Sequence, residues 1–356
     1  MKAIALDAMG GDQAPAATVQ GALLAAGEGI PVVLVGDRER IEAELEGKNT
    51  EALPLRVHHA SDVITMEDHA SEVRGRKDSS IVQAALLVKR GEASACVSMG
   101  HSGATMAAAL LGLGRIRGVE RPAILTDVPS QKGRVALLDV GANAECRPSH
   151  LQHFAVMGAA YARAFFGKSA PSVGLLSIGE EPHKGNDLVI RAHALLRETA
   201  GIRFYGNVEG RDLFRGTTDV VVTDGFTGNV VLKLAEGEAK VLFAWLREEL
   251  LAGGAMTRLG AALVKPALLR VAARLDPDEY GGAPLLGVDG FVFIGHGSSG
   301  AVAVRNALRT SSRAVEVGLV ERLRGDMAAL AQETGQQETG RQETGRQESR
   351  TRESQS

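Results

Sequence analysis

The chain has 356 residues, of which 44% are hydrophobic and 4% aromatic, and its formal net charge is −3. This length suffices for one large α/β domain or two smaller ones. The charge and the scarcity of aromatic side chains exclude a basic, base-stacking surface, so we expect no nucleic-acid partner. No run approaches the roughly 18 apolar residues of a membrane-spanning helix, so any membrane contact is expected to be peripheral.

The cysteine content and the N-terminal segment indicate in which cellular compartment the protein is located. Cys96 and Cys146 are too few for a disulfide framework and fit a reducing environment. The N-terminal segment reaches Asp7 and a Gly-Gly turn too early for a secretory signal. These features predict a cytoplasmic protein.

Short apolar runs alternate with helical patterns along the chain. The expected strands are Ala3–Leu6, Val32–Val35, Leu55–His58, Ala95–Val97, Ala123–Leu125, Val135–Leu138, Val173–Leu176, Val220–Val222 and Phe291–Ile294. The expected helices are Pro15–Ala26, Arg38–Leu45, Ser80–Arg90, His150–Phe166, Asp187–Arg197, Val230–Leu250 and Val302–Leu323. Such alternation predicts an α/β fold whose mainly parallel sheet is covered by helices on both faces. Because no clear linker interrupts it, we expect residues 1–330 to form one catalytic unit.

Leu250–Asp278 departs from this alternation, because Gly253 and Gly254 break the preceding helix and Pro266 divides the next one. After Pro266, one helical face is apolar and the other is basic. The apolar residues are Leu268, Val271 and Leu275, and the basic ones are Arg270 and Arg274. The segment is either a helical hairpin packed on its own domain or on a second copy, or a membrane-surface segment.

The last residues, 331–356, repeat a Gln-Glu-Thr-Gly pattern. They contain almost no apolar side chain that could be buried, so we expect a disordered tail with no chemistry assigned to it.

Six of the apolar runs end in turns rich in glycine and small polar residues. The turns are Asp7–Asp12, Ser98–Gly103, Asp139–Asn143, Ser177–Glu181, Thr223–Asn229 and Gly295–Gly300. Ligands of open α/β sheets bind at the carboxyl ends of parallel strands, where such turns gather. Backbone N–H groups at helix starts suit an anion, phosphate above all. The pattern predicts that the turns converge on one pocket for an anionic small molecule.

Five side chains in or beside these turns are candidate catalytic groups. Lys184 can hold a phosphate or an oxyanion as a point charge, and Asp224 can orient a cation. Asn229 and Asn143 can donate amide hydrogens to an oxyanion, and His296 can protonate a leaving group or bind phosphate. The alternative for these residues is turn formation, helix capping or a solvated loop position.

Further turn residues are expected to contact phosphate or substrate through backbone and small side chains. They are Gly10, Gly11, Ser98, His101, Gly103, Gly228 and Ser298. Asp7 and Asp12 could in principle bind Mg²⁺, but no third carboxylate is spaced to complete the site, so we expect no metal. Arg76 and Lys77 form a basic loop that suits a phosphate or an acidic partner, or is simply solvated.

The order of these turns resembles the phosphate acyltransferase (PlsX) family of bacterial phospholipid synthesis. The matching segments are Ala5–Asp12, Leu138–Asn143, Gly174–Glu181, Lys184–Asn186, Gly206–Gly210, Asp219–Asn229, Tyr280–Gly287 and Gly295–Ser299. One segment departs from the family pattern, since His101 and Ser102 stand where the family usually has asparagine and threonine.

The resemblance implies a three-layer αβα sandwich related to phosphotransacetylase and isocitrate dehydrogenase-like folds. It implies acyl transfer from acyl-carrier protein to inorganic phosphate, giving acyl phosphate without a cofactor, in a homodimer associated peripherally with the membrane. Lys184 would then bind phosphate, Asn229 or Asn143 would stabilise the oxyanion, and His296 would serve the leaving sulfur. The positive charge of some residues and the helix face of others make six residues candidates for contact with the carrier or the membrane. They are Arg76, Lys77, Leu268, Arg270, Val271 and Arg274.

Two other functions remain open at this point. A dehydrogenase of related architecture would need a nucleotide site and usually a carboxylate cluster for metal, and neither is evident. A non-catalytic membrane scaffold would have no use for polar turns at so many strand ends.

Overall fold

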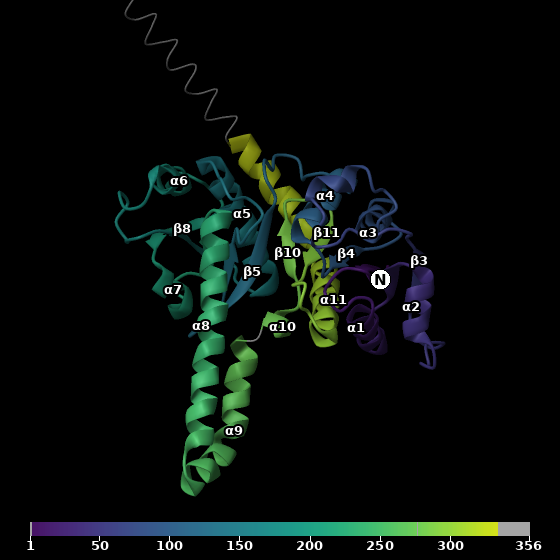
Figure 1. The fold of residues 1–356 in the computed structure, drawn as a ribbon. Helices are drawn as coiled ribbons and strands as arrows, with labels where there is room; N and C mark the ends of the chain where they lie inside the picture. The colour runs from purple at the N-terminus through teal and green to yellow at the C-terminus, as the bar shows by residue number, and fades with distance from the viewer. Residues whose placement is uncertain (1, 276, 334–356) are drawn as a thin grey trace, which may run out of the picture.

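The computed structural model describes residues 2–275 and 277–333 (Figure 1). The strands are β1 (Ile4–Asp7), β2 (Val32–Gly36), β3 (Leu55–His59), β4 (Ala95–Ser98), β5 (Ala123–Ser130), β6 (Gly133–Leu138), β7 (Ser172–Leu176), β8 (Arg203–Val208), β9 (Val220–Val222), β10 (Ala283–Leu286) and β11 (Phe291–Ile294). The helices are α1 (Ala16–Gly27), α2 (Arg38–Leu45), η1 (Ala70–Arg74), α3 (Ser80–Lys89), α4 (Ser102–Gly112), α5 (Pro148–Phe165), α6 (Asp187–Arg197), α7 (Gly210–Arg215), α8 (Gly225–Ala252), α9 (Ala255–Leu275), α10 (Pro277–Tyr280) and α11 (Ala301–Glu316).

All eleven of these strands belong to one sheet in the order β3-β2-β1-β4-β11-β10-β5-β6-β9-β7-β8. Its two faces carry separate hydrophobic layers. Ile4 and Leu6 share one layer with α1, α5 and α11, whereas Ala5 belongs to the other layer with α3 and α4. Successive side chains of a strand point to opposite faces, so a strand buried on both sides must be apolar throughout. The prediction of an α/β fold with a mainly parallel sheet is confirmed.

The direction of the strands reverses inside the sheet. β10 is antiparallel to both β11 and β5, and β5 is antiparallel to β6. Three reversals leave β6, β7, β8 and β9 running opposite to β1, β2, β3, β4 and β11. The six glycine turns therefore lie in two groups and do not gather along one edge. The expectation that all six meet along one edge is wrong, because the four-residue strand β10 has no periodic signal in the sequence and the reversals around it were not expected.

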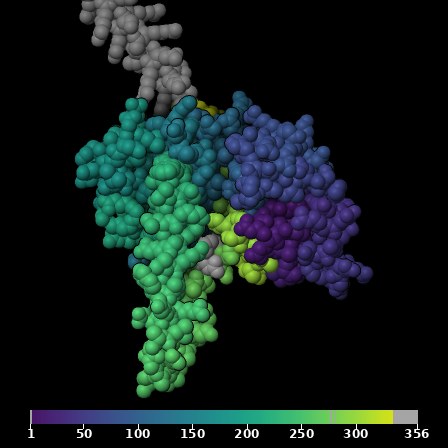
Figure 2. All heavy atoms as spheres, in the orientation of Figure 1, coloured from purple at the N-terminus to yellow at the C-terminus, as the bar shows by residue number. Residues whose placement is uncertain are grey.

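The helix α8 and its successor α9 form a hairpin that stands clear of the body (Figures 1 and 2). The hairpin turns at Gly253, and α9 has no buried residue. Pro266 was expected to divide α9, but the helix continues through it. Proline removes one backbone hydrogen bond, and the freed carbonyl of an exposed helix can be hydrated instead.

The boundary of the closing helix also differs from the expected one. The closing helix was expected to run to Leu323, but α11 ends at Glu316 and a separate helix covers 319–333. Gly318 between them has a φ of 63°, a left-handed conformation that glycine adopts without strain. Most of the predicted tail, from 334 onward, lies outside the described residues. Within the described part of the chain, no helix combines the length and apolarity that crossing a membrane requires.

Candidate functional site

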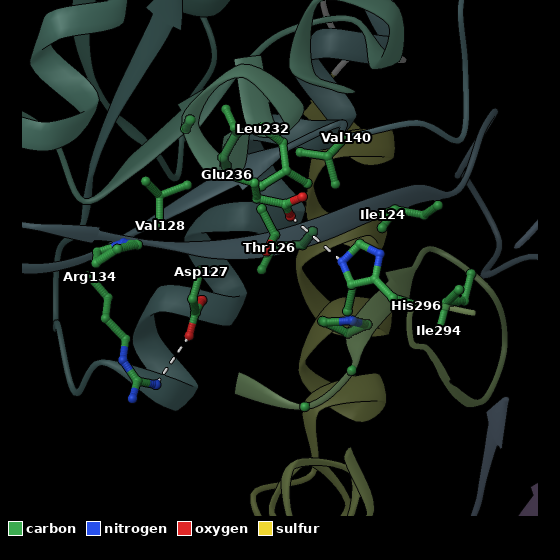
Figure 3. A pocket seen from close by; sticks show the side chains of 18 of the residues that line it. Ile124, Thr126, Asp127, Val128, Arg134, Val140, Leu232, Glu236, Ile294 and His296 are labelled. Atoms are coloured by element: carbon green, nitrogen blue, oxygen red, sulfur yellow. Dashed lines mark hydrogen bonds and ion pairs between the residues drawn. The ribbon is translucent and has the colours of Figure 1, made fainter. Parts of the chain in front are cut away.

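A cavity of about 290 Å³ lies where β5, β10, β11 and α8 meet (Figure 3). Its wall joins segments that are far apart in the sequence. Ser102 comes from the start of α4, Val140 follows β6, Asn229 belongs to α8 and His296 follows β11. Turns from both halves of the sheet thus contribute to one cavity, although they belong to strands of opposite direction.

The start of α8 is held firmly against the end of β6. Asp224 caps the helix, its carboxylate accepting hydrogen bonds from the backbone N–H and hydroxyl of Thr227, both at 2.8 Å. Gly225 and Gly228 pack directly on the loop that follows β6, leaving no room for a β-carbon. This packing fixes Asn229 at the cavity wall. Asp224 therefore has the capping role that was its alternative interpretation.

The side-chain amide of Asn143 is hydrogen-bonded within the same region. Its amide nitrogen donates to the Pro122 carbonyl at 2.7 Å and to the Asp139 carboxylate at 2.8 Å. Asn143 and Asp139 are both buried, and burial raises the pKa of Asp139. Asn143 is not among the residues that line the cavity, so of the two candidate asparagines only Asn229 reaches it.

Three polar side chains gather at the mouth of the cavity. His296 Nε2 lies 3.7 Å from one Glu236 oxygen, and Lys233 Nζ lies 2.9 Å from the other (Figure 3 shows the first contact). Burial lowers the pKa of His296, and the charge of Lys233 lowers it further, so the imidazole is neutral at neutral pH. Lys233 and Glu236 were missed from the sequence, although their spacing after Asn229 places all three on one face of a helix.

A buried carboxyl lines the opposite side of the cavity. Asp127 of β5 has a side chain only 7% exposed, and one oxygen lies 3.3 Å from the Arg134 guanidinium (Figure 3). Its other oxygen, Oδ1, is fully enclosed, and the hydroxyl of the buried Tyr161 lies near the carboxyl. Burial raises the pKa of Asp127 to about 6, although the nearby Arg134 guanidinium and Tyr161 hydroxyl lower it in part. Sequence analysis did not single out Asp127, since it lies inside a strand and beside no turn.

The turns after β1, β4 and β11 contact one another. The Ser98 hydroxyl donates to Asp7 at 2.8 Å, and the Asp12 N–H donates to the Gly297 carbonyl at 2.7 Å. Gly10 packs on the Asp7 carboxylate and the backbone of the β4 turn, with no space for a side chain. Ser98 and Gly10 thus hold turns together, and neither lines the main cavity.

A second cavity, of about 230 Å³, lies beside this group of turns and includes Gly11, Asp12 and His101 in its wall. His101 Nδ1 also accepts the Ala104 N–H at 3.1 Å and so caps α4, and Gly103 packs against its ring. Among residues 2–275 and 277–333, no group of three or more His, Cys, Asp or Glu is arranged to hold a metal ion.

The remaining candidates lie away from the main cavity. Lys184 and Ser298 are exposed in loops and are not among its lining residues. Arg76 is bound by the carboxylates of Asp62 at 2.6 Å and Asp68 at 2.8 Å, so its charge is largely used within its own loop. Lys77 next to it is exposed. On the hairpin, Leu268 is half-buried, and Arg270, Val271 and Arg274 are exposed.

Sequence comparison decides the family. Residues 2–322 match the family model described as "Fatty acid synthesis protein". A phosphate acyltransferase from Thermus thermophilus is 61% identical over 327 residues, which cover 92% of this chain and 99% of that protein. The chain belongs to the phosphate acyltransferase family. Another phosphate acyltransferase, from Pelotomaculum thermopropionicum, is 52% identical over 92% of this chain and 95% of its own.

Structural comparison agrees with this family assignment at the level of the fold. A EutD phosphotransacetylase from Staphylococcus aureus superposes with a TM-score of 0.56 at 16% identity, covering 88% of this chain and 94% of that one. A 4-hydroxythreonine-4-phosphate dehydrogenase from Klebsiella pneumoniae gives 0.50 at 14% identity over 88% and 98% of the two chains. Similarity at this identity shows a shared fold. The chain itself is an enzyme, a phosphate acyltransferase of fatty acid and phospholipid synthesis, so the dehydrogenase and scaffold alternatives are wrong.

Proposed function

We propose that the enzyme moves a fatty acyl group from acyl-carrier protein to inorganic phosphate, giving acyl phosphate and the free carrier thiol. The observation that supports this most directly is the composition of the main cavity. Lys233, Asn229 and His296 line it together with apolar side chains from β5, β6 and α8. Phosphate carries its own nucleophilic oxygen, so the reaction needs no serine or cysteine nucleophile and no cofactor.

Phosphate is held at the mouth of the cavity by Lys233 and by the start of α4, where Ser102 lines the wall. Lys233 takes the role that the sequence suggested for Lys184, because Lys233 reaches the cavity and Lys184 does not line it. Held there, a phosphate oxygen is close to the thioester carbon, and this proximity supplies much of the rate enhancement.

The reaction needs one hydrogen-bond donor to the oxyanion and one group that stabilises the departing sulfur. The phosphate oxygen attacks the thioester carbon, and the Asn229 amide donates to the oxyanion that forms. When the tetrahedral intermediate collapses, the carbon–sulfur bond breaks and sulfur leaves with the electron pair. Neutral His296 donates an N–H hydrogen bond to that sulfur, which stabilises the departing thiolate.

The apolar part of the cavity is suited to the acyl chain. Ile124, Val128, Leu137 and Leu232 line it, and the first three are buried. A substrate with one charged reacting end and one hydrocarbon tail matches a cavity whose wall combines charged groups with these apolar side chains.

The α8–α9 hairpin carries the proposed contacts outside the active site. Its tip exposes Met256, Leu259 and Leu263, and the sequence of α9 has four basic residues and no acidic one. We propose that the tip rests on an anionic membrane surface, which makes the enzyme a peripheral protein on the cytoplasmic side. Farther from the tip, Leu242 and Trp245 are 59% and 64% exposed, and we propose that a second copy covers them in a homodimer.

The test of the reaction is phosphate-dependent release of carrier thiol. The purified enzyme is incubated with acyl-carrier thioester, and free thiol is measured with and without inorganic phosphate. Thiol release that requires phosphate and is accompanied by acyl phosphate supports the proposal. Release at the same rate without phosphate would show hydrolysis instead and contradict it.

A further inference from the structure

A carboxylate lies directly beside the lysine that is proposed to bind phosphate. Glu236 Oε2 accepts a hydrogen bond from Lys233 Nζ at 2.9 Å, and Glu236 Oε1 lies 3.7 Å from His296 Nε2 (Figure 3). The second distance is too long for a hydrogen bond, so within the described part of the chain Oε1 keeps its capacity to accept one. Glu236 lines the main cavity together with Lys233 and His296, and the proposed mechanism gives it no role.

The negative charge of Glu236 opposes the binding of an anion at Lys233. An anion oxygen in hydrogen-bond contact with Lys233 Nζ lies within about 6 Å of Glu236 Oε2, because both contacts share the same nitrogen atom. The Glu236 side chain is only 16% exposed, so water and salt screen this repulsion incompletely. Neutral His296 does not offset it. Lys233 and Glu236 together thus offer an anion no net charge, and phosphate needs a further attractive contact to bind there.

The proton that phosphate carries supplies such a contact. At neutral pH, phosphate keeps at least one P–OH group, whereas sulfate has the same tetrahedral shape and no proton. An ionised carboxylate only accepts hydrogen bonds, and a P–OH group can donate to it in a strong, charge-assisted bond. Sulfate has no donor to offer, so the same carboxylate repels it. Lys233 and Glu236 are three residues apart on one helix face, where they present one donor and one acceptor side by side.

We propose, on the basis of the proposed function, which places phosphate at Lys233, that Glu236 selects phosphate over sulfate by accepting the hydrogen bond of the P–OH group. Lys233 binds a second phosphate oxygen, and the dianion keeps further unprotonated oxygens, one of which can attack the thioester carbon. Glu236 is then a specificity-determining residue. A site that hydrogen-bonds a hydroxyl of its ligand strongly rejects an analogue without that hydroxyl, because the acceptor of the site is then left unpaired.

The test measures anion binding by titration calorimetry without an acyl donor, so it does not depend on turnover. The dissociation constants (Kd) of phosphate, arsenate and sulfate are compared in the wild type and in Glu236→Gln, which keeps the size of the side chain and removes its charge. We expect the wild type to bind phosphate at least tenfold more tightly than sulfate. In Glu236→Gln, the Kd of sulfate should fall at least tenfold and that of phosphate should change less, because the glutamine amide can donate to either anion.

Arsenate separates the effect of the proton from that of anion size. It carries a proton at neutral pH, as phosphate does, but it is larger than both phosphate and sulfate. We expect the Kd of arsenate for the wild type to be closer to that of phosphate than to that of sulfate. Arsenate binding as weak as sulfate binding would assign the discrimination to size and overturn the role of Glu236.

Glu238→Gln is the matched control, since Glu238 is exposed on the same helix and does not line the cavity. This variant should keep the wild-type ratio of the Kd values for sulfate and phosphate. A ratio as low as in Glu236→Gln would assign the selectivity to the overall charge of the helix and contradict the role of Glu236. Lys233→Met should weaken phosphate binding at least tenfold. Wild-type phosphate affinity in Lys233→Met would place the anion elsewhere and overturn the inference.

The remaining outcomes distinguish anion selectivity from the reaction. Equal wild-type Kd values for phosphate and sulfate would overturn the role of Glu236. An equal loss of affinity for both anions in Glu236→Gln would show a structural role and overturn it as well. Selective phosphate binding without phosphate-dependent thiol release would contradict the proposed reaction alone.

Discussion

Gly228 of α8 lies against the backbone carbonyl of Asp139 at the end of β6, with no room for a β-carbon between them. This contact sets how closely α8 approaches the sheet, and the next residue, Asn229, lines the cavity. We expect Gly228→Ala to push α8 outward, to lower stability by about 1–3 kcal/mol and to lower kcat at least tenfold. Urea unfolding and phosphate-dependent thiol release measure the two effects.

Gly237 on the same helix is the matched control. A β-carbon there would meet nothing within 4 Å. Gly237→Ala should stabilise the protein by about 0.5–1 kcal/mol and leave turnover unchanged, because alanine favours the helix and touches nothing. Equal losses in both variants would mean that the helix tolerates no alanine at all and that the contact with Asp139 is not the cause.

Lys233 is expected to carry phosphate binding. Lys233→Met should raise the KM for phosphate at least tenfold with little change in the KM for the acyl donor, because the ammonium charge is lost at the mouth of the cavity. Lys184→Met is the comparison, and we expect it to have a smaller effect. A larger phosphate effect at Lys184 would assign phosphate binding to the loop between β7 and α6 and contradict the role of Lys233.

The pH profile tests His296. Because burial and Lys233 lower its pKa, the imidazole is neutral at pH 7 and becomes protonated only below its ordinary range. Protonation places a second cation beside Lys233, so we expect kcat to change on the acidic side of about pH 6.5, and His296→Gln to abolish that inflection. An unchanged inflection in His296→Gln would assign it to another group.

Asp127 gives a stability prediction with a definite sign. Its pKa of about 6 lies above the value of about 3.9 for an unfolded aspartate, so the folded state binds the proton more tightly. This contribution makes wild-type stability fall as pH rises from about 4 to about 6. Asp127→Asn should approach the wild type near pH 4 and be more stable by up to about 3 kcal/mol at pH 7. Urea unfolding at both pH values measures the difference, and a variant less stable at pH 7 would contradict it.

Met256 at the hairpin tip and Ile178 on the body are equally exposed, at 81%. We expect Met256→Gln to weaken co-sedimentation with anionic lipid vesicles several-fold, since it removes an apolar side chain from the proposed membrane surface. Ile178→Gln should bind vesicles as the wild type does. Equal binding of both variants would place the membrane contact elsewhere.

Nine of the eleven strands and most helices were predicted, because each strand contains a short apolar run between helical patterns. Prediction failed at β8, an edge strand with several exposed residues, at β10, and at the direction of the sheet. The four residues of β10 include Pro284 and contain no alternation, so only tertiary pairing reveals them as a strand. The position of every turn relative to the others depends on that pairing.

The candidate site was predicted in part. Asn229 and His296 were found because they lie in glycine-rich turns, and both line the cavity. Glycine-rich turns also form where backbones only pack together, as at Gly10 and Ser98, and sequence alone does not separate the two cases. Asp127 was missed for the opposite reason, because burial of a carboxyl inside a strand leaves no pattern in the neighbouring residues.

One uninterrupted helix, α8, carries cavity residues at its start and the hairpin at its end. The number of residues between the cavity and the tip therefore fixes the orientation of the tip about the helix axis. Each inserted or deleted residue rotates the tip by about 100°, and a change of about seven residues, or two turns, restores its original orientation. The number of residues in α8 therefore fixes the orientation of the active site relative to the surface that the hairpin tip contacts.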